Sequence, residues 1–421
     1  MMSTEHESLK QLFQQEFAKM VAVISKHFGL RHMELAEDIV SETFLQASES
    51  WGLKGMPDKP AAWLYAVARQ KMLYHFRRNK IFEDKVVPEL VDRQRLETDA
   101  FQFSLETIKD SQLQMLFAIC NPAIASEAQI GLALRILCGF GIDEIAEAFL
   151  SSKETINKRL FRAREKLRTE KVTMELPPEH QISRRLDNVL HIIYLLFNEG
   201  YYSKTQNQLL HKDLCLEAMR LCLMLTTCER TNTPKTNALM ALMCFHSSRF
   251  AAREDSKNDN DLILYDEQNE ALWDAGLIRQ GTYFLGRSAE GDEMSSYHLE
   301  ARIASWHCRK EDHPEKWRDV LALYNQLLQV NYSPGVALNR VYALYKAKGY
   351  QAAIPEAEKL NCDRDHFYYV LLGELYRHDD EKKAAFNFEK AYALAKTATE
   401  KKSLKRKIDQ LNAPAKTSGH R

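Results

Sequence analysis

The chain has 421 residues, in which 58 Lys and Arg balance 58 Asp and Glu, so its formal net charge is zero. This balance excludes a uniformly basic or acidic protein but not local patches of either sign. It contains 15 Gly and 11 Pro, about half their usual share, which is typical of an all-α chain with long helices.

The cysteines and the N-terminus favour a reducing compartment. None of the eight cysteines forms a CxxC pair, and the opening stretch MMSTEHESLK has no apolar signal core. The longest strongly apolar run, residues 189–197, is too short to cross a bilayer. We therefore expect a cytoplasmic protein with no membrane partner.

Breaks in the helical periodicity divide the chain into five parts. An acidic stretch with little periodicity and a later proline pair, Pro177 and Pro178, supply the clearest boundaries. The predicted parts are a first helical module (1–80), a flexible linker (81–108), a second helical module (109–172), a helical connecting domain (173–298) and helical repeats (299–410).

Two helices of the first module have surfaces of different chemistry. The helix Ala36–Ser48 exposes Glu37, Asp38 and Glu42, which suits a protein partner more than DNA. The helix from Pro60 to Asn79 carries five Lys/Arg and no acid between residues 69 and 80, interleaved with aromatic side chains. Aromatic rings stack on unpaired bases while cations follow the backbone; alternatively, its aromatics belong to a helical core.

The segment Glu127–Arg168 predicts a helix–turn–helix. An apolar helix ends at Gly139, a short helix follows at 142–150, and a longer helix starts with Ser151 at capping-box spacing to Glu154. Residues 153–171 contain eight Lys/Arg against three Glu. Opposite the apolar stripe of this last helix lie Lys153, Glu154, Asn157, Lys158, Arg162 and Arg164. This surface favours duplex DNA over a merely solvated helix face.

The C-terminal part predicts helical repeats and no catalytic or metal site. A Leu-Tyr pattern at Leu344 returns 31 residues later at Leu375, which is typical of a tetratricopeptide-like (TPR-like) solenoid. A calcium loop at residues 255–266 lacks the required Gly. A zinc site at His211, Cys215 and Cys222 lacks a fourth ligand. Without a phosphate loop or nucleophile elbow, we expect no enzyme activity, metal or cofactor.

Together these stretches resemble the extracytoplasmic-function (ECF) sigma factors of bacterial RNA polymerase. The sequence AEDIVSETFLQA (36–47) is similar to the family's polymerase-binding helix, and KPAAWLYAVARQKMLYHFRR (59–78) resembles the helix that melts and reads the −10 element. The stretch 127–168 resembles region 4, which reads the −35 element. Segments such as YLLFNEGY (194–201) resemble the subgroup with a C-terminal TPR-like extension.

The resemblance implies core RNA polymerase and promoter DNA as partners, and a protein or peptide partner for the repeats. The expected polymerase-binding residues are Asp38, Ile39, Glu42 and Phe44. The expected −10 residues are Trp63, Arg69, Lys71, Tyr74, His75, Arg77 and Arg78. The expected −35 residues are Ser152, Lys153, Glu154, Thr155, Asn157, Lys158, Arg159 and Arg162. The loop 51–60 carries no obvious polar pocket for a flipped base, so its ligands stay unnamed.

Two other functions compete with this interpretation. A stand-alone helix–turn–helix regulator with a repeat sensor would bind duplex DNA without polymerase, but it has no use for the two surfaces of the first module. A repeat scaffold without any DNA role would not need the basic surplus on 153–171.

Overall fold

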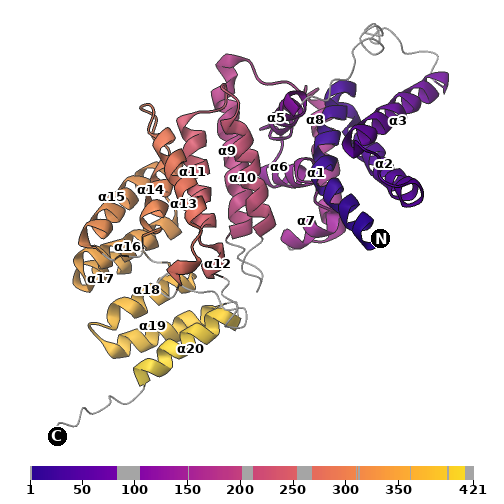
Figure 1. Cartoon of the computed structure of the whole chain (residues 1–421). Coiled ribbons are helices and arrows are strands. Elements are labelled where there is room, and N and C mark those ends of the chain that lie inside the picture. Colours follow the sequence, from indigo (N-terminus) through magenta and orange to yellow (C-terminus); the bar gives the residue numbers. More distant parts are fainter. Residues whose placement is uncertain are drawn as a thin grey trace. The chain divides into compact units, whose positions relative to one another are not determined.

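The computed structural model describes residues 2–82, 105–149, 151–201, 212–253, 268–309, 311, 313–360, 362–395 and 398–412. All regular elements in these ranges are helices, so the predicted all-α class is confirmed (Figure 1). In chain order they are α1 (Met2–Phe28), η1 (Leu30–His32), α2 (Met33–Lys54), α3 (Pro60–Phe82), α5 (Leu105–Ile119), α6 (Ser126–Leu132), η2 (Ala133–Leu137), α7 (Ile142–Ala148), α8 (Lys153–Thr169), α9 (Glu179–Tyr201), α10 (Lys212–Thr226), α11 (Pro234–Ser247), α12 (Phe250–Arg253), η4 (Glu270–Leu272), α13 (Ala275–Ser288), α14 (Ser296–Trp306), α15 (Pro314–Val330), α16 (Pro334–Lys348), α17 (Tyr350–Glu358), α18 (His366–Tyr376), α19 (Glu381–Leu394) and α20 (Ala398–Asn412).

The chain forms two compact units, residues 1–196 and 197–421. The division falls inside α9, whereas the sequence places a boundary at the proline pair before that helix. The reason is local: Arg185 Nη2 donates to the Phe117 carbonyl at 2.6 Å, and Asn188 Nδ2 donates to the Cys120 carbonyl at 2.7 Å. The five predicted domain ranges stay predictions, and residues 83–104 of the expected linker lie outside the described residues.

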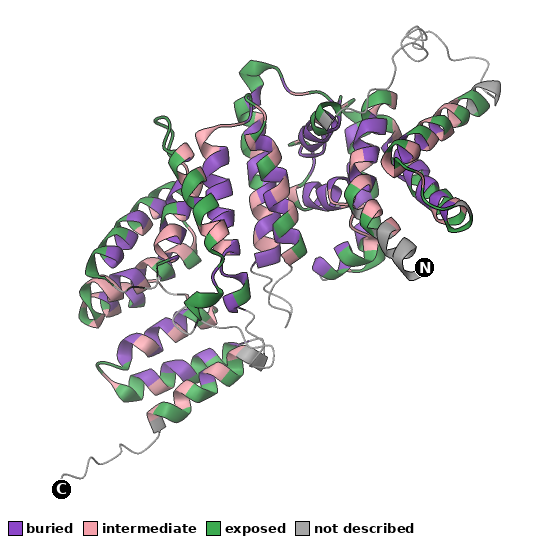
Figure 2. Ribbon diagram, viewed as in Figure 1, coloured by how far each residue is buried: buried purple, intermediate pink, exposed green. Residues whose placement is uncertain are grey.

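The first module is built around α1, which is buried on every side. Met20 through Ser25 are six successive residues with exposed fractions of 4% or less. A helix that is apolar all round needs neighbours on more than one face. Here α2 and α3 cover one part of α1, and α5 and η2 of the second module pack against it as well. Figure 2 shows, by contrast, how buried and exposed faces alternate around most other helices.

The second module follows the predicted order of short helix, turn and longer helix, with two local differences. The apolar helix changes from α6 into the π-helical turn η2, which carries Arg135. Gly139 ends that turn with a φ of +75°, a conformation that glycine tolerates best. The cap of α8 is Ser152, not Ser151, because the Ser151 N–H still donates to the Ala146 carbonyl at 2.9 Å and so belongs to the turn.

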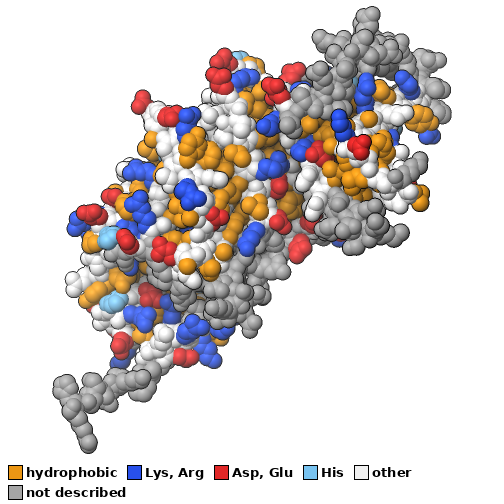
Figure 3. Space-filling view, in the orientation of Figure 1, with side chains coloured by type: hydrophobic (Ala, Val, Ile, Leu, Met, Phe, Trp, Pro, Cys, Tyr) orange, Lys and Arg blue, Asp and Glu red, His pale blue; other side chains and the backbone are white. Residues whose placement is uncertain are grey.

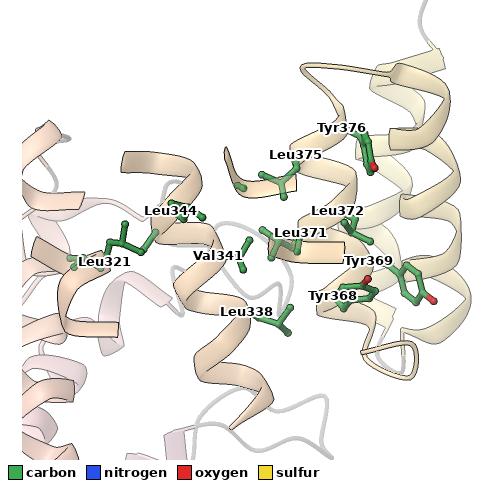
Figure 4. Close-up of a cluster of buried hydrophobic side chains, with 14 of the residues drawn as sticks. Leu321, Leu338, Val341, Leu344, Tyr368, Tyr369, Leu371, Leu372, Leu375 and Tyr376 are labelled. Carbon is green, nitrogen blue, oxygen red and sulfur yellow. The ribbon is translucent and has the colours of Figure 1, made fainter. Parts of the chain in front are cut away.

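The C-terminal unit contains a helical array with one continuous apolar core. Each helix from α14 to α20 packs against the next along the chain. Figure 4 shows Leu338, Val341 and Leu344 of α16 facing the apolar side chains of α18. Gly373 allows close approach, because a Cβ there would lie 2.6 Å from the Phe388 ring. This arrangement is compatible with a TPR-like solenoid, which remains a prediction.

Two further observations bear on the sequence predictions. The helix α9 continues through Tyr201, whereas the glycine at position 200 suggested an end there. Among the described residues, no helix is both long enough and apolar enough to traverse a bilayer.

Candidate nucleic-acid interface

The outward face of α8 presents most of the predicted duplex-binding residues to solvent. The Ser152 hydroxyl accepts a hydrogen bond from the Thr155 N–H at 3.2 Å and fixes where the helix begins. Four apolar side chains on the opposite face anchor the helix to its module, namely Ile156, Leu160, Ala163 and Leu167. The exposed residues of the predicted set are Ser152, Lys153, Glu154, Thr155, Asn157, Lys158 and Arg162.

Three charged residues of this set differ in how firmly they are held. Arg159 is only 26% exposed at its side chain, pairs with Glu127 at 3.0 Å and lies over the Phe149 ring. Lys153 pairs with Asp143 at 2.6 Å, but both side chains are mostly exposed, so the pair adds little stability. Hydrogen bonds from its own backbone N–H and from Ser152 lower the pKa of Glu154, which favours its charged form.

Phe161 is an exposed residue of α8 that the sequence prediction omitted. Its ring is 55% exposed, one turn after Lys158 on a helix whose other apolar residues of this size are buried. An exposed ring can make apolar contact with a thymine methyl group in the major groove. The signal was present in the sequence, because position 161 directly follows the apolar stripe residue Leu160 and therefore points away from the core.

The basic-aromatic helix α3 divides its residues between the core and the surface. Leu64, Ala68 and Met72 are fully buried, as the helical spacing predicts. Tyr74 is 66% exposed, and Arg77 and Arg78 are exposed. These last three residues form the accessible cationic and aromatic part of the helix.

The remaining predicted −10 residues are partly buried and engaged with the protein. The Trp63 ring lies edge-on to Trp51, with ring centroids 5.3 Å apart. Lys71 Nζ donates to the Glu42 carbonyl at 3.2 Å. Arg69 and His75 are half-buried and also have partners within the protein. The structure thus gives the set two subsets, one accessible and one held in place.

The predicted polymerase-binding residues of α2 separate in the same way. Asp38 and Glu42 are exposed and lie four residues apart, on one face of the helix. Ile39 and Phe44 are each 5% exposed, and the Phe44 ring packs edge-on against Phe13 at 5.0 Å. Only the two carboxylates are directly available to a partner.

Glu37, the neighbour of Asp38, contradicts its sequence prediction. It was expected to be exposed on α2, but it is 4% exposed and contacts the second module. Arg135 Nε donates to one carboxylate oxygen at 2.9 Å and Arg164 Nη2 donates to the other at 2.6 Å. Arg164, expected on the outward face of α8, is likewise largely buried, with a side chain 15% exposed. Both predictions failed because they treated each helix alone.

The electrostatics of this buried cluster are balanced between two effects. Burial raises the pKa of the Glu37 carboxyl, and the adjacent guanidinium groups of Arg164 and Arg135 oppose the rise. Arg135 also donates to the Phe140 carbonyl of its own module at 3.1 Å, and Arg164 reaches Glu34 at 3.5 Å. Three helical elements that are distant in sequence therefore meet at one carboxylate.

The described residues hold no group of side chains suited to a metal ion. His211 and the acidic residues at 255–266 lie outside the described residues. Cys215 and Cys222 are buried apolar groups: burial raises the pKa of Cys215 to about 12, and its Sγ lies 3.5 Å from the Phe197 carbonyl. Figure 3 shows Lys and Arg scattered among Asp and Glu on the drawn face, with no single continuous basic patch.

Comparisons with known proteins divide the chain into characterised and uncharacterised stretches. A family model described as sigma-70 region 2 matches residues 13–81, which form α1–α3. A family of unknown function, DUF6596, matches residues 185–289, from α9 to α13. An uncharacterized protein of Rhizobium meliloti is 31% identical over 399 residues, which cover 92% of each chain.

A characterised relative covers less of the chain. The ECF RNA polymerase sigma factor BldN of Streptomyces coelicolor is 27% identical over 129 residues, or 30% of this chain and 47% of that protein. The chain therefore spans about half the length of that relative. No solved structure matches this chain.

Proposed function

Because this chain belongs to the sigma-70 family and to the same family as the uncharacterized Rhizobium meliloti protein, we propose that it is an ECF-type sigma factor that directs core RNA polymerase to promoters. The observation that carries the proposal is the surface of the region 2 module. It combines exposed carboxylates on α2 with exposed aromatic and cationic side chains on α3. A regulator that binds only duplex DNA needs neither surface.

In this proposal, Asp38 and Glu42 of α2 bind a basic surface of core polymerase. Exposed charges at an interface chiefly steer association and set specificity. Ile39 and Phe44 act from inside the module, since both are buried and hold α2 in its orientation.

The −10 element is bound by α3 when the strands separate. Tyr74 supplies a ring on which a base can stack, and Arg77 and Arg78 neutralise backbone phosphates. Trp63 and Lys71 hold the loop and α2 against α3 through their contacts with Trp51 and Glu42. Arg69 and His75 complete the predicted −10 set.

The −35 element is bound by α8 in the major groove. Glu154 can accept from a cytosine amino group, and Lys158 and Arg162 can neutralise phosphates or donate to guanine. Phe161 adds an apolar contact to this set. Removing Lys158 should reduce the slope of log affinity against log salt by about 0.9.

The test of this function is co-elution with sigma-free bacterial core RNA polymerase on gel filtration. The double variant Asp38→Lys/Glu42→Lys should bind core at least about tenfold more weakly, because like charges placed opposite one another cost several kcal/mol. Glu49→Lys is the matched control, an exposed carboxylate on the same helix. If the unaltered protein fails to bind excess core at low salt yet binds specific duplex DNA alone, the stand-alone regulator replaces the sigma factor.

The TPR-like C-terminal helices supply a regulatory surface in this proposal. Repeat arrays of paired helices characteristically bind peptides or proteins, and exposed rings such as Tyr332 and Phe386 offer contacts. A chain truncated after residue 201 tests this role, because a cut at 175 would remove the α9 contacts to Phe117 and Cys120. Unchanged transcription from a dependent promoter in cells would contradict a regulatory role.

A further inference from the structure

The contact between the two promoter-binding modules involves the surfaces that the proposed function needs. Glu37 directly precedes Asp38 on the polymerase-binding helix α2, and Arg164 lies two residues after Arg162 on the DNA-binding helix α8. The bonds from Arg135 and Arg164 to Glu37 are 2.9 and 2.6 Å long. We call these three residues the Glu37 latch.

Other contacts extend this interface beyond the ion pairs. The position of a Cβ on Gly139 would lie 3.8 Å from the Phe17 ring of α1, and the Arg135 guanidinium lies 6.0 Å from the same ring. Arg168 of α8 is near enough to His32 of η1 to help burial lower the pKa of that histidine. The second module thus covers the side of α1 and α2 that its own module leaves open.

The closed arrangement is incompatible with simultaneous binding to both promoter elements. The −10 and −35 elements are about 25 base pairs apart, or roughly 85 Å of B-DNA. In the closed chain, α8 contacts Glu37 of α2, and Lys71 of α3 contacts Glu42 one turn further along α2. Arg162 is two residues from Arg164, and Glu37 is five from Glu42, so these steps add about 10 Å of helix plus a few side-chain lengths, far short of that distance.

We propose that the Glu37 latch holds the two promoter-binding modules closed in the free protein, and that the latch must open before polymerase and promoter can be engaged. This inference rests on the proposed function for its consequence, but the closure itself is a property of the chain alone. The occupant of the covered surface is the chain's own second module. Core polymerase displaces it.

A charged latch is suited to such a transition because both of its sides can be solvated. Breaking an apolar interface leaves surface that water does not stabilise, whereas a separated carboxylate and guanidinium each regain hydration. The stem of Arg135 is tied to its own module by the Phe140 carbonyl. Arg164 makes both of its described ion pairs, to Glu34 and Glu37, across the interface. Arg164 is therefore the residue whose change separates the modules with least effect inside either one.

The first arm of the test measures closure without any partner. Donor and acceptor dyes are attached to non-natural amino acids at positions 26 and 173 of the full chain, since both are exposed and the chain holds eight free cysteines. The unaltered protein should give one population with high energy transfer. Arg164→Gln and Glu37→Gln should raise the low-transfer population at least about tenfold, and Arg164→Lys should give an intermediate value.

The matched controls keep the helix and the charge change but leave the latch intact. Lys166→Gln on α8 removes a cation that pairs only with Glu170 of the same segment, at 2.7 Å. Glu49→Gln changes an exposed carboxylate of α2. Both should keep the high-transfer population, and circular dichroism should show unchanged helix content in every variant. If Arg164→Gln and Glu37→Gln also keep high transfer, the latch is overturned.

The second arm measures association with core RNA polymerase by stopped flow. Arg164→Gln should associate about tenfold faster than the unaltered protein, and Lys166→Gln at the unaltered rate. An increase is diagnostic, since loss of a cation would by itself slow binding to DNA. If the variants open but associate at the unaltered rate, the inhibitory role is overturned. If the variants open and no form binds polymerase, the closure stands and the proposed function fails.

Discussion

Two interfaces in this protein are built from opposite chemistry. Between the promoter-binding modules, a carboxylate that is 4% exposed receives hydrogen bonds from two arginines. Between α18 and α19, the fully buried Phe388 fills the space that Gly373 leaves open. The first contact joins residues up to 127 positions apart, and the second joins neighbouring helices.

The difference teaches which parts of the molecule can separate. Apolar side chains packed at crystal-like density lose both van der Waals contact and hydrophobic stabilisation when they part. Charged groups lose only the difference between one another and water, which is small when both can be hydrated. The repeat array should therefore behave as a fixed body and the module contact as a reversible one.

The largest effect is expected in the apolar interface. Phe388→Ala should destabilise the α18–α19 region by about 3–5 kcal/mol, because it removes the ring and leaves a cavity. Phe386→Ala, on the same helix but 55% exposed, should stay within about 0.5 kcal/mol. Hydrogen exchange of α18 and α19 measures both. Equal losses in the two variants would mean that this core does not hold the array together.

A smaller and more local effect is expected at the module contact. Arg164→Gln should lower protection against hydrogen exchange in α2 around Glu37 by roughly 1.5–3 kcal/mol, the usual contribution of hydrogen bonds to charged groups. Protection of Leu64 and Met72 in α3 should persist, since their module keeps its own core. Loss of protection throughout α1–α3 would show that the contact is part of the fold and cannot open alone.

Acid should distinguish the repeat-bearing unit from a purely apolar body. Burial lowers the pKa of His307 to about 3, and its ring packs edge-on to the core residue Trp317. The unfolded chain takes up this proton below about pH 6.5, so stability falls as the pH drops from 6.5 toward 3. At pH 5 the loss should be about 2 kcal/mol.

Urea unfolding followed by hydrogen exchange of α14 and α15 measures that acid dependence. His307→Phe should flatten it, while His313→Gln should leave it unchanged, because the His313 side chain is 66% exposed. A slope that survives His307→Phe would assign the acid sensitivity to another buried group, such as His246.

The smallest effect concerns the exposed ring on α8. Phe161→Ala should weaken specific DNA binding by about 1 kcal/mol, the scale of one apolar contact to a base methyl. It should leave the salt dependence unchanged, because no phosphate contact is lost. Folding stability should shift by less than about 0.5 kcal/mol. Weaker binding to every sequence alike would place Phe161 outside the base-reading surface.

The all-α fold and most of the surface of α8 could be predicted from the sequence, because each depends on periodicity within one helix. The apolar spacing of Ile156, Leu160, Ala163 and Leu167 fixes which side of α8 faces the module. The same spacing identifies Leu64, Ala68 and Met72 as the buried side of α3. The exposed positions of Asp38 and Glu42 follow from the corresponding argument on α2.

What only the tertiary structure decided is the fate of the charged residues at the edges of those faces. Glu37 and Asp38 are adjacent carboxylates on one helix, and no local pattern distinguishes the one that is buried. Their difference arises because Arg135 and Arg164 arrive from segments about 100 residues away or more. Helical periodicity determines the direction in which a side chain points, but a charge becomes buried only when a distant segment supplies both the cover and the opposite charge.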